Sequence, residues 1–403
     1  MGMSRMETRD ETSVHPKFVI YVPNSRLTAF HNRSPWLMLP RAFRELAYEP
    51  ILICAELATK CPEGVQLFQT GLTVKAEGYL TRRGLLRSLI EPLLAFHEIA
   101  RRKPDLVIFS PLRSSLATLL VMVVLYRLVS SRSTRFILKT DYGFDETSPI
   151  RVISLLSHGL VALSSRVLDM VSVETSCGVE RAKRIPWVAR QKVVRVPLGF
   201  PKGCIEPKTY EEVARDPVIL CVARIARMKG QDVLLRAFSM LTTKYPQWSI
   251  RLVGPEQDVA FKQELIEYAV THDLKNKVTF LGSVEERVID SEYRRASIFC
   301  LPSVHSESAG QVKYEATACG LPVVTTDVPC GRDALEMGWR LARAGDVASL
   351  ATQLDVLMND EDERRRVVAH AQSLQIPYED VASLYIRELG RFETHLPLSP
   401  QGG

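Results

Sequence analysis

Residues Ser297–Gly331 read SIFCLPSVHSESAGQVKYEATACGLPVVTTDVPCG, and this stretch decides the fold. Its short apolar run, Ile298–Leu301, predicts a buried strand that ends before Pro302. Helical spacing predicts a helix over Gly310–Cys319, and the β-branched run Val323–Thr326 predicts the next strand. The stretch is therefore one βαβ unit, and its first loop lies outside the carboxyl end of a strand, where open parallel sheets bind ligands.

The size and composition of the chain favour a soluble protein of two domains. A chain of 403 residues is too long for one ordinary core. Its content of 46% apolar and 24% charged residues is typical of globular proteins. Eight cysteines include no C-x-x-C pair, so buried thiols in a reducing compartment are expected rather than a zinc site. The first sixteen residues are polar, and the longest apolar run, residues 116–126, is shorter than the about 20 residues of a membrane span. We expect a cytoplasmic protein.

Predicted strands and helices alternate along the chain, which indicates mainly parallel sheets covered on both faces. After a disordered N-terminus over residues 1–16, we expect a first domain over residues 17–200. A polar stretch separates it from a second domain over residues 217–376, and a final helix covers residues 377–394. The predicted fold class is α/β, with two Rossmann-like, doubly wound parallel-sheet domains in tandem.

The net charge of +6 is unevenly distributed between the two halves. Residues 1–200 hold 28 Lys and Arg against 17 Asp and Glu, a net charge of +11, whereas the rest of the chain carries −5. A basic first half suggests an anionic partner, for which membrane phospholipid, a lipid-phosphate acceptor and nucleic acid all qualify. The basic-flanked helix expected over Leu85–Ala100 is either a membrane-facing surface or an ordinary packed helix, and Pro92 argues against the first interpretation.

Two groups of residues indicate a site for a nucleotide diphosphate. Arg224 and Lys229 follow the predicted strand Val218–Val222, and their cationic heads are suited to a diphosphate. The helix start near Gly310 adds backbone N–H groups and a positive dipole end. Glu315, as an acceptor-only carboxylate, is suited to the paired hydroxyls of a ribose.

These motifs resemble a known enzyme family. The pattern R-x4-K-G at Arg224–Gly230 and the pattern E-x7-E at Glu307 and Glu315 precede A-x-A-x-G-x-P-V-V at residues 316–324. Their order and setting are similar to the retaining glycosyltransferases of family 4, which have the GT-B fold of two Rossmann-like domains facing a cleft. The resemblance covers most of residues 217–345.

The resemblance implies roles for individual residues. Arg224 and Lys229 would contact the donor diphosphate and stabilise the leaving group, Glu307 would face the transferred sugar, and Glu315 would hold the ribose. Phosphate and sugar hydroxyls would be held by the following run: Ser308, Ala309, Gly310 and Gln311. The resemblance also implies retention of anomeric configuration, no cofactor and no metal. It further implies that the helix from Tyr378 crosses back onto the first, acceptor-binding domain, with the donor on the second.

The first domain departs from the pattern of that family. The loop after the first strand, residues 23–28, has no glycine pair and carries Arg26 instead, and the wider loop adds His31 and Arg33. Where many members have a histidine, this chain has Asp141 preceded by Lys139. We interpret Asp141, Lys139 and Arg26 as candidate contacts to an acceptor or sugar hydroxyl.

The sequence therefore predicts a hexosyltransferase that moves a sugar from a UDP- or GDP-sugar to a glycan or lipid-linked acceptor. We expect it at the cytoplasmic face of the cell membrane, held there peripherally by the basic half. A soluble enzyme that uses a sugar phosphate as acceptor remains an alternative. A non-catalytic nucleic-acid-binding protein is a third, but no basic-aromatic motif supports it, so nucleic acid is not expected as a partner.

Overall fold

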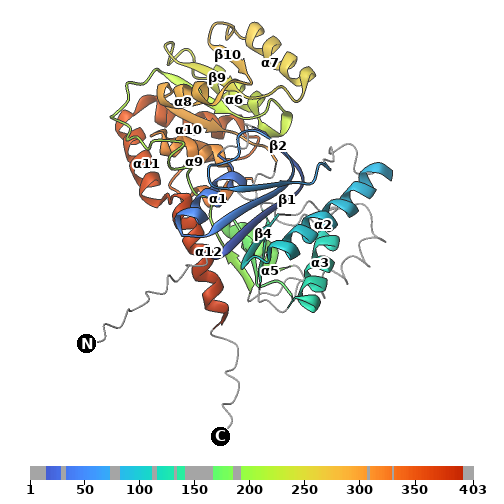
Figure 1. Cartoon of the computed structure of the whole chain (residues 1–403). Coiled ribbons are helices and arrows are strands. Elements are labelled where there is room, and N and C mark those ends of the chain that lie inside the picture. The colour runs from blue at the N-terminus through green and yellow to red at the C-terminus, as the bar shows by residue number, and fades with distance from the viewer. Residues whose placement is uncertain are drawn as a thin grey trace, which may run out of the picture.

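The computed structural model describes residues 15–28, 33–72, 82–110, 116–130, 134–140, 167–184, 192–305, 309–328 and 331–393. Within these ranges the chain forms two parallel β-sheets, each covered by helices (Figure 1). The seven described strands of the first sheet have the order β3-β2-β1-β4-β5-β6-β7, and the six of the second have the order β10-β9-β8-β11-β12-β13. The predicted α/β class with two parallel-sheet domains is confirmed.

The first sheet has two long strands, β1 and β2, and five shorter ones. Their bounds are β1 (Lys17–Thr28), β2 (Glu49–Ala58), β3 (Gln66–Gln69), β4 (Leu106–Phe109), β5 (Arg135–Thr140), β6 (Met170–Val173) and β7 (Val193–Arg195). The described helices around this sheet are α1 (Pro35–Glu45), α2 (Arg82–Arg102), α3 (Leu116–Val129) and α5 (Ser176–Lys183). Alternate residues of β1 enter different cores, Val19 with α2 and α3 on one face and Ile20 with α1 on the other.

The second sheet is built in the same way. Its strands are β8 (Val218–Val222), β9 (Ser249–Val253), β10 (Val278–Gly282), β11 (Ile298–Leu301), β12 (Val323–Thr326) and β13 (Arg340–Ala342). The helices that follow are α6 (Gln231–Ser239), α7 (Val259–Thr271), α8 (Glu286–Arg295), α9 (Gln311–Ala318), α10 (Val347–Asn359) and α11 (Glu361–Leu374). No described helix is both long and apolar enough to cross a membrane.

The strand order places a switch point in each sheet. The chain winds outward in opposite directions from β1 and β4 in the first sheet, and from β8 and β11 in the second. Loops that leave two such neighbouring strands diverge to opposite faces and leave a crevice between them. In the second sheet, the two diverging loops are those that carry the R-x4-K-G and E-x7-E motifs.

The last helix, α12 (Tyr378–Glu393), connects the two halves. It leaves α11 and runs down beside α1 on the first sheet (Figure 1), where Val381, Ala382 and Tyr385 join the core formed with Phe18 and Phe43. Gly199 lies under the start of this helix, because a Cβ at that position would be 2.9 Å from the backbone nitrogen of Tyr378.

Several elements differ from the sequence prediction. The first strand was expected to close at Pro23, but β1 continues to Thr28 through a register shift between Val22 and Arg26. Such a bulge tolerates a residue that has no N–H to donate to the ladder. β3, β13 and α5 were not predicted from the sequence, because they are short and only partly apolar.

Candidate functional site

The loop that leaves β8 carries the two cations predicted to hold a diphosphate. Arg224 lies just beyond the strand, and Lys229 ends the short 3-10 helix η4 (Arg227–Lys229). Both side chains are half-buried. The side-chain amide of Gln231 fixes the loop by donating to the carbonyl oxygen of Arg224 over 2.8 Å. A guanidinium and an ammonium are therefore held at the carboxyl edge of the sheet, where a phosphate can pair with them.

Gly230 joins this loop to the loop after β11. Its φ of 67° lies in the left-handed region, and a Cβ there would be 2.0 Å from the carbonyl oxygen of Pro302, so only glycine permits this approach. Beside it, the N–H of Val304 donates to the carbonyl oxygen of Met228 over 3.0 Å. The structure thus brings together, at the switch point, the loops of two motifs that lie far apart in the sequence.

Helix α9 begins in the second of these loops. Its N-cap, Gly310, has a φ of 74° and no side chain that could cap the first N–H groups. Gln311 accepts a hydrogen bond from the hydroxyl of Tyr378 over 2.8 Å, while its Nε2 is buried and has no hydrogen-bond partner among the described residues. Ala309 is buried. The helix start therefore offers N–H donors to an anion or a hydroxyl. Glu307 and Ser308, predicted to lie in the same loop, fall outside the described residues.

Glu315 lies within α9 and is buried, with 7% of its surface exposed. Its Oε2 accepts a hydrogen bond from the Tyr293 hydroxyl over 3.2 Å, and the Arg33 Nη1 lies 3.6 Å from the same oxygen. Burial raises the pKa of Glu315, and the charge of Arg33 and the bond from Tyr293 oppose that rise. The carboxylate predicted to hold a ribose therefore has two protein partners in this structure.

Arg33 was not singled out by sequence reasoning, although it lies in the basic loop after the first strand. Its guanidinium reaches from the first half of the chain to α8, where Nε is 2.9 Å from Glu286 Oε1 and Nη2 donates to Asp290. Burial acts to lower the pKa of Arg33, but the carboxylates of Glu315, Asp290 and Glu286 together raise it. No local signal reveals this contact, because the partners are separated by about 250 residues in the sequence.

Lys313 is a second residue that sequence reasoning passed over. It is buried beside the predicted phosphate-binding turn, where a Cβ on Gly310 would lie 2.7 Å from its Cε. Its ammonium lies over the ring of Trp339, with 5.2 Å from Nζ to the ring centroid. In the sequence, Lys313 is one lysine within a predicted helix. That position does not distinguish a side chain packed in the core from one that contacts a ligand.

Of the residues predicted to contact an acceptor, Lys139 has a described side chain, near the carboxyl end of β5. Lys139, in β5, is buried and pairs with Glu174 over 2.5 Å, and its ammonium lies 5.2 Å from the ring centroid of Trp36. Asp141 and the side chain of Arg26 fall outside the described residues. The structure therefore shows Lys139 in a buried ion pair, and the role predicted for all three residues stays a prediction.

The acidic run Asp360-Glu361-Asp362 has the pattern D-x-D and lies at the start of α11. Asp360 is the N-cap of α11, and its Oδ1 accepts a hydrogen bond from the N–H of Glu363 over 2.9 Å. The D-x-D pattern is therefore a helix cap with acidic residues in the first turn, where the helix dipole favours them.

Comparisons with known proteins agree with this geometry. The profile of the family "Glycosyl transferases group 1" matches residues 205–374. An uncharacterized glycosyltransferase of Haemophilus influenzae is 26% identical over 207 residues, which is 50% of this chain and 57% of that protein. The D-inositol 3-phosphate glycosyltransferase of Nocardia farcinica is 34% identical over 166 residues, covering 39% of this chain and 37% of that enzyme. The chain thus aligns with about half or less of the length of these relatives.

Two solved structures resemble the chain over almost its whole length. The Anabaena protein HepE in complex with UDP has a TM-score of 0.67 at 16% identity and covers 93% of this chain and 99% of its own. Sucrose-phosphate synthase from Thermosynechococcus elongatus has a TM-score of 0.67 at 18% identity, covering 94% and 99%. The chain therefore has the GT-B fold, and residues 205–374 resemble the glycosyl transferases group 1 family.

Proposed function

We propose that this chain is a retaining glycosyltransferase that moves a sugar from a UDP- or GDP-sugar to a hydroxyl of a glycan or lipid-linked acceptor. The junction of the loops after β8 and β11 supports the proposal. It holds two cations and the start of α9 at one edge of the sheet, fixed by Gly230 and by the bond from Val304 to Met228. A diphosphate needs such a combination of positive charge and N–H donors.

The proposed reaction breaks the bond between the anomeric carbon and a diphosphate oxygen. The acceptor hydroxyl oxygen forms the new bond to that carbon, and the nucleoside diphosphate leaves with the bonding electrons and takes up the hydroxyl proton on its departing oxygen. Negative charge grows on the leaving oxygen, and Arg224 and Lys229 are placed in the loop that would neutralise it. Glu307 is predicted to face the transferred sugar and Glu315 the ribose. We further propose that no cofactor or metal is needed.

A transfer assay tests this function. The protein is incubated with UDP- and GDP-sugars and a panel of lipid-linked and free glycans, and products are analysed by mass spectrometry and by proton NMR of the new anomeric centre. We expect a product with the donor's anomeric configuration, formed equally well in EDTA. An inverted product contradicts retention, and loss of activity in EDTA that returns with a divalent cation contradicts metal independence. No transfer from any nucleotide sugar contradicts the proposed activity itself.

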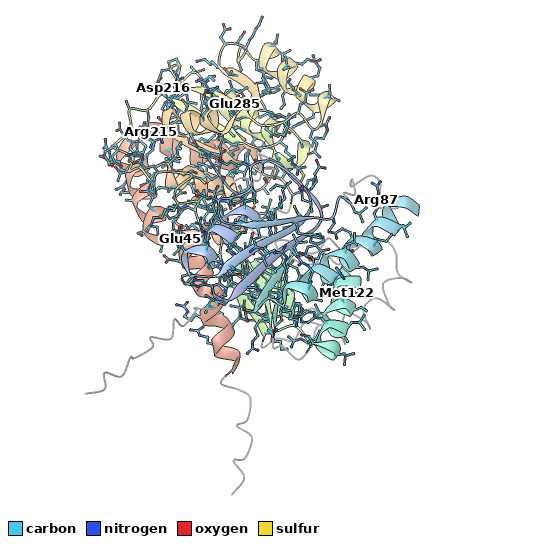
Figure 2. The ribbon with its side chains drawn as sticks, in the orientation of Figure 1. Glu45, Arg87, Met122, Arg215, Asp216 and Glu285 are labelled. Carbon is cyan, nitrogen blue, oxygen red and sulfur yellow. The ribbon has the colours of Figure 1, made fainter. Side chains whose placement is uncertain are left out.

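We propose that the acceptor is reached at an anionic membrane, on its cytoplasmic face, through the surface of α2 and α3. Helix α2 exposes Leu86 (57%), Leu93 (49%) and Leu94 (41%), and α3 exposes Leu125 (47%) and Leu128 (76%). Helix α2 has five arginines, and its two glutamates, Glu91 and Glu98, are buried. Apolar side chains beside cations suit a bilayer of anionic lipid. Figure 2 shows Arg87 toward the outer end of α2 and Met122 on the neighbouring α3.

Sedimentation with vesicles tests the membrane surface. We expect the protein to bind phosphatidylglycerol-containing vesicles at low salt, and the variant Leu86→Ser/Leu93→Ser to lose most of that binding. The matched control, Met240→Ser/Val259→Ser, removes exposed apolar side chains (61% and 69%) from the second half of the chain. Equal binding of all three proteins contradicts the assignment of the surface.

A second candidate is a soluble enzyme that uses a sugar phosphate or inositol phosphate as acceptor. Relatives named D-inositol 3-phosphate glycosyltransferase and a structural neighbour named sucrose-phosphate synthase favour it. The acceptor panel therefore includes hexose 6-phosphates and inositol 3-phosphate. Transfer to one of these, together with an absence of vesicle binding, would favour this candidate over the membrane enzyme.

A further inference from the structure

Arg33 crosses from one half of the chain into the other. It precedes α1 on the first sheet, yet its guanidinium is buried against the second half, with a side chain only 7% exposed. It meets three carboxylates there: Glu286 at 2.9 Å, Asp290 by a hydrogen bond and Glu315 at 3.6 Å. A buried guanidinium is stable only when paired, so this contact holds the first domain against α8 and α9.

The same contact covers the carboxylate that the donor is proposed to use. Glu315 has a side chain that is 9% exposed, and its Oε2 is flanked by Arg33 and the hydroxyl of Tyr293. A ribose presents two adjacent hydroxyls and needs an open approach to the carboxylate that accepts from them. In the arrangement observed, the guanidinium lies in that approach, so Arg33 and a ribose would compete for Glu315.

We propose that Arg33 is an interdomain latch that excludes a nucleoside diphosphate from Glu315 until the latch opens. The inference rests on the proposed function of this site and adds a step to it. Donor binding and release of Arg33 from Glu286, Asp290 and Glu315 are one coupled equilibrium. The apparent affinity for the donor is then lowered by the fraction of molecules whose latch is closed.

The chain provides a matched control in another contact between the two halves. Arg195, at the end of β7, pairs with Glu336 over 2.5 Å. The hydroxyl of Ser176, at the start of α5, donates a hydrogen bond to the same Glu336 over 2.9 Å. Arg195→Ala therefore loosens the same interface and leaves Arg33 and Glu315 in place. It separates a general loosening of the domains from the competition proposed.

Calorimetric titration with UDP, GDP and ADP tests the latch in four proteins: wild type, Arg33→Ala, Arg195→Ala and the double variant Glu286→Gln/Asp290→Asn. The double variant weakens the latch but keeps both Arg33 and Glu315. We expect Arg33→Ala to bind the preferred nucleotide about tenfold more tightly than wild type, corresponding to a latch closed in about nine molecules of ten. The double variant should bind more tightly too, and Arg195→Ala should bind as wild type does.

Hydrogen–deuterium exchange without nucleotide gives a second readout. We expect faster exchange of the α8 amides in Arg33→Ala than in wild type or Arg195→Ala. Weaker nucleotide binding in Arg33→Ala would overturn the latch, since Arg33 would then support the donor site. Equal tightening in Arg195→Ala, or unchanged exchange in α8, overturns it as well. If no protein binds any nucleotide, the competition fails together with the proposed donor site, whereas normal wild-type binding without tightening defeats the latch alone.

Discussion

Three cations in the loop after β8 have different surroundings, which separates their proposed roles. Arg227 is exposed, pairs with Glu264 and has its guanidinium 5.0 Å from the ring centroid of Phe261. Arg224 and Lys229 are half-buried on either side of it, in the loop that the bond from Val304 to Met228 ties to the loop after β11. The side chain of Arg227 is therefore bound to residues of α7 at the surface. Arg224 and Lys229 belong to the junction where a diphosphate is proposed to bind.

Replacing these cations singly tests their roles. Arg224→Ala and Lys229→Ala should each lower kcat/KM for sugar transfer by about 100-fold, because each removes a charge that stabilises the leaving diphosphate. Arg227→Ala, in the same loop, should stay within about twofold of wild type in the same steady-state assay. A loss in Arg227→Ala as large as in the other two would contradict this division of roles.

The buried pair of Lys139 and Glu174 makes a prediction about stability. Lys139→Met leaves a buried carboxylate without this partner and should destabilise the protein by about 3–5 kcal/mol. The double variant Lys139→Met/Glu174→Leu removes both charges and should recover most of that loss. Urea unfolding of the two variants and wild type measures the difference. If the double variant is as stable as wild type yet inactive, Lys139 has the acceptor role predicted from the sequence; if it is active, the pair serves the fold alone.

Among the secondary-structure elements, those with strong local signals were predicted closely. β8, β11 and β12 are fully buried runs of apolar and β-branched residues, and their predicted and observed bounds agree. β1 differed because its length depends on pairing with β2 beyond the bulge at Pro23, a contact made across the sheet. Prediction therefore succeeded where the residues of a segment alone determine its secondary structure. It failed where pairing with a neighbouring strand determines how far the segment extends.

The junction of the two motif loops depends on one glycine. Gly230→Ala combines a left-handed φ with a clash against the Pro302 carbonyl and should lower stability by about 3 kcal/mol. Gly203→Ala is a matched control, because Gly203 also has a positive φ, 81°, but no atom lies near its missing Cβ. That variant should lose only about 1 kcal/mol. Thermal unfolding of both tests the claim, and equal losses would contradict a specific contact at Gly230.

The end of α2 makes a prediction about acid stability. Hydrogen bonds from Arg101 and Arg102 lower the pKa of Glu98 from 4.5 to about 2. Because the folded-state pKa is lowered, the stabilisation is complete above about pH 4.5 and is lost as the pH falls toward 2. Glu98→Gln should therefore be less stable than wild type at pH 7, and the gap should narrow between pH 4.5 and 2. Glu180→Gln, which alters an exposed pair with Lys183, is the control and should show no such gap.

At the level of the whole molecule, the sequence predicted both sheets and the separate motifs but no side-chain contact between the two halves. The pairing of Arg33 with Glu315 links the loop after β1 to α9 and depends on the relative position of two domains. Hydrophobic periodicity and motif spacing describe one segment at a time, so they carry no information on such a contact. The role of Glu307, like that of Asp141, stays a prediction from the sequence.

The central claim is that the junction of the loops after β8 and β11 binds the diphosphate of a sugar nucleotide. Calorimetric titration of UDP, GDP and ADP into wild type and the variant Arg224→Ala/Lys229→Ala tests it most directly. We predict that at least one nucleotide binds wild type and that the double variant binds it more weakly by a factor of about ten or more. Absence of binding by all three nucleotides, or equal affinity in the two proteins, would contradict the claim.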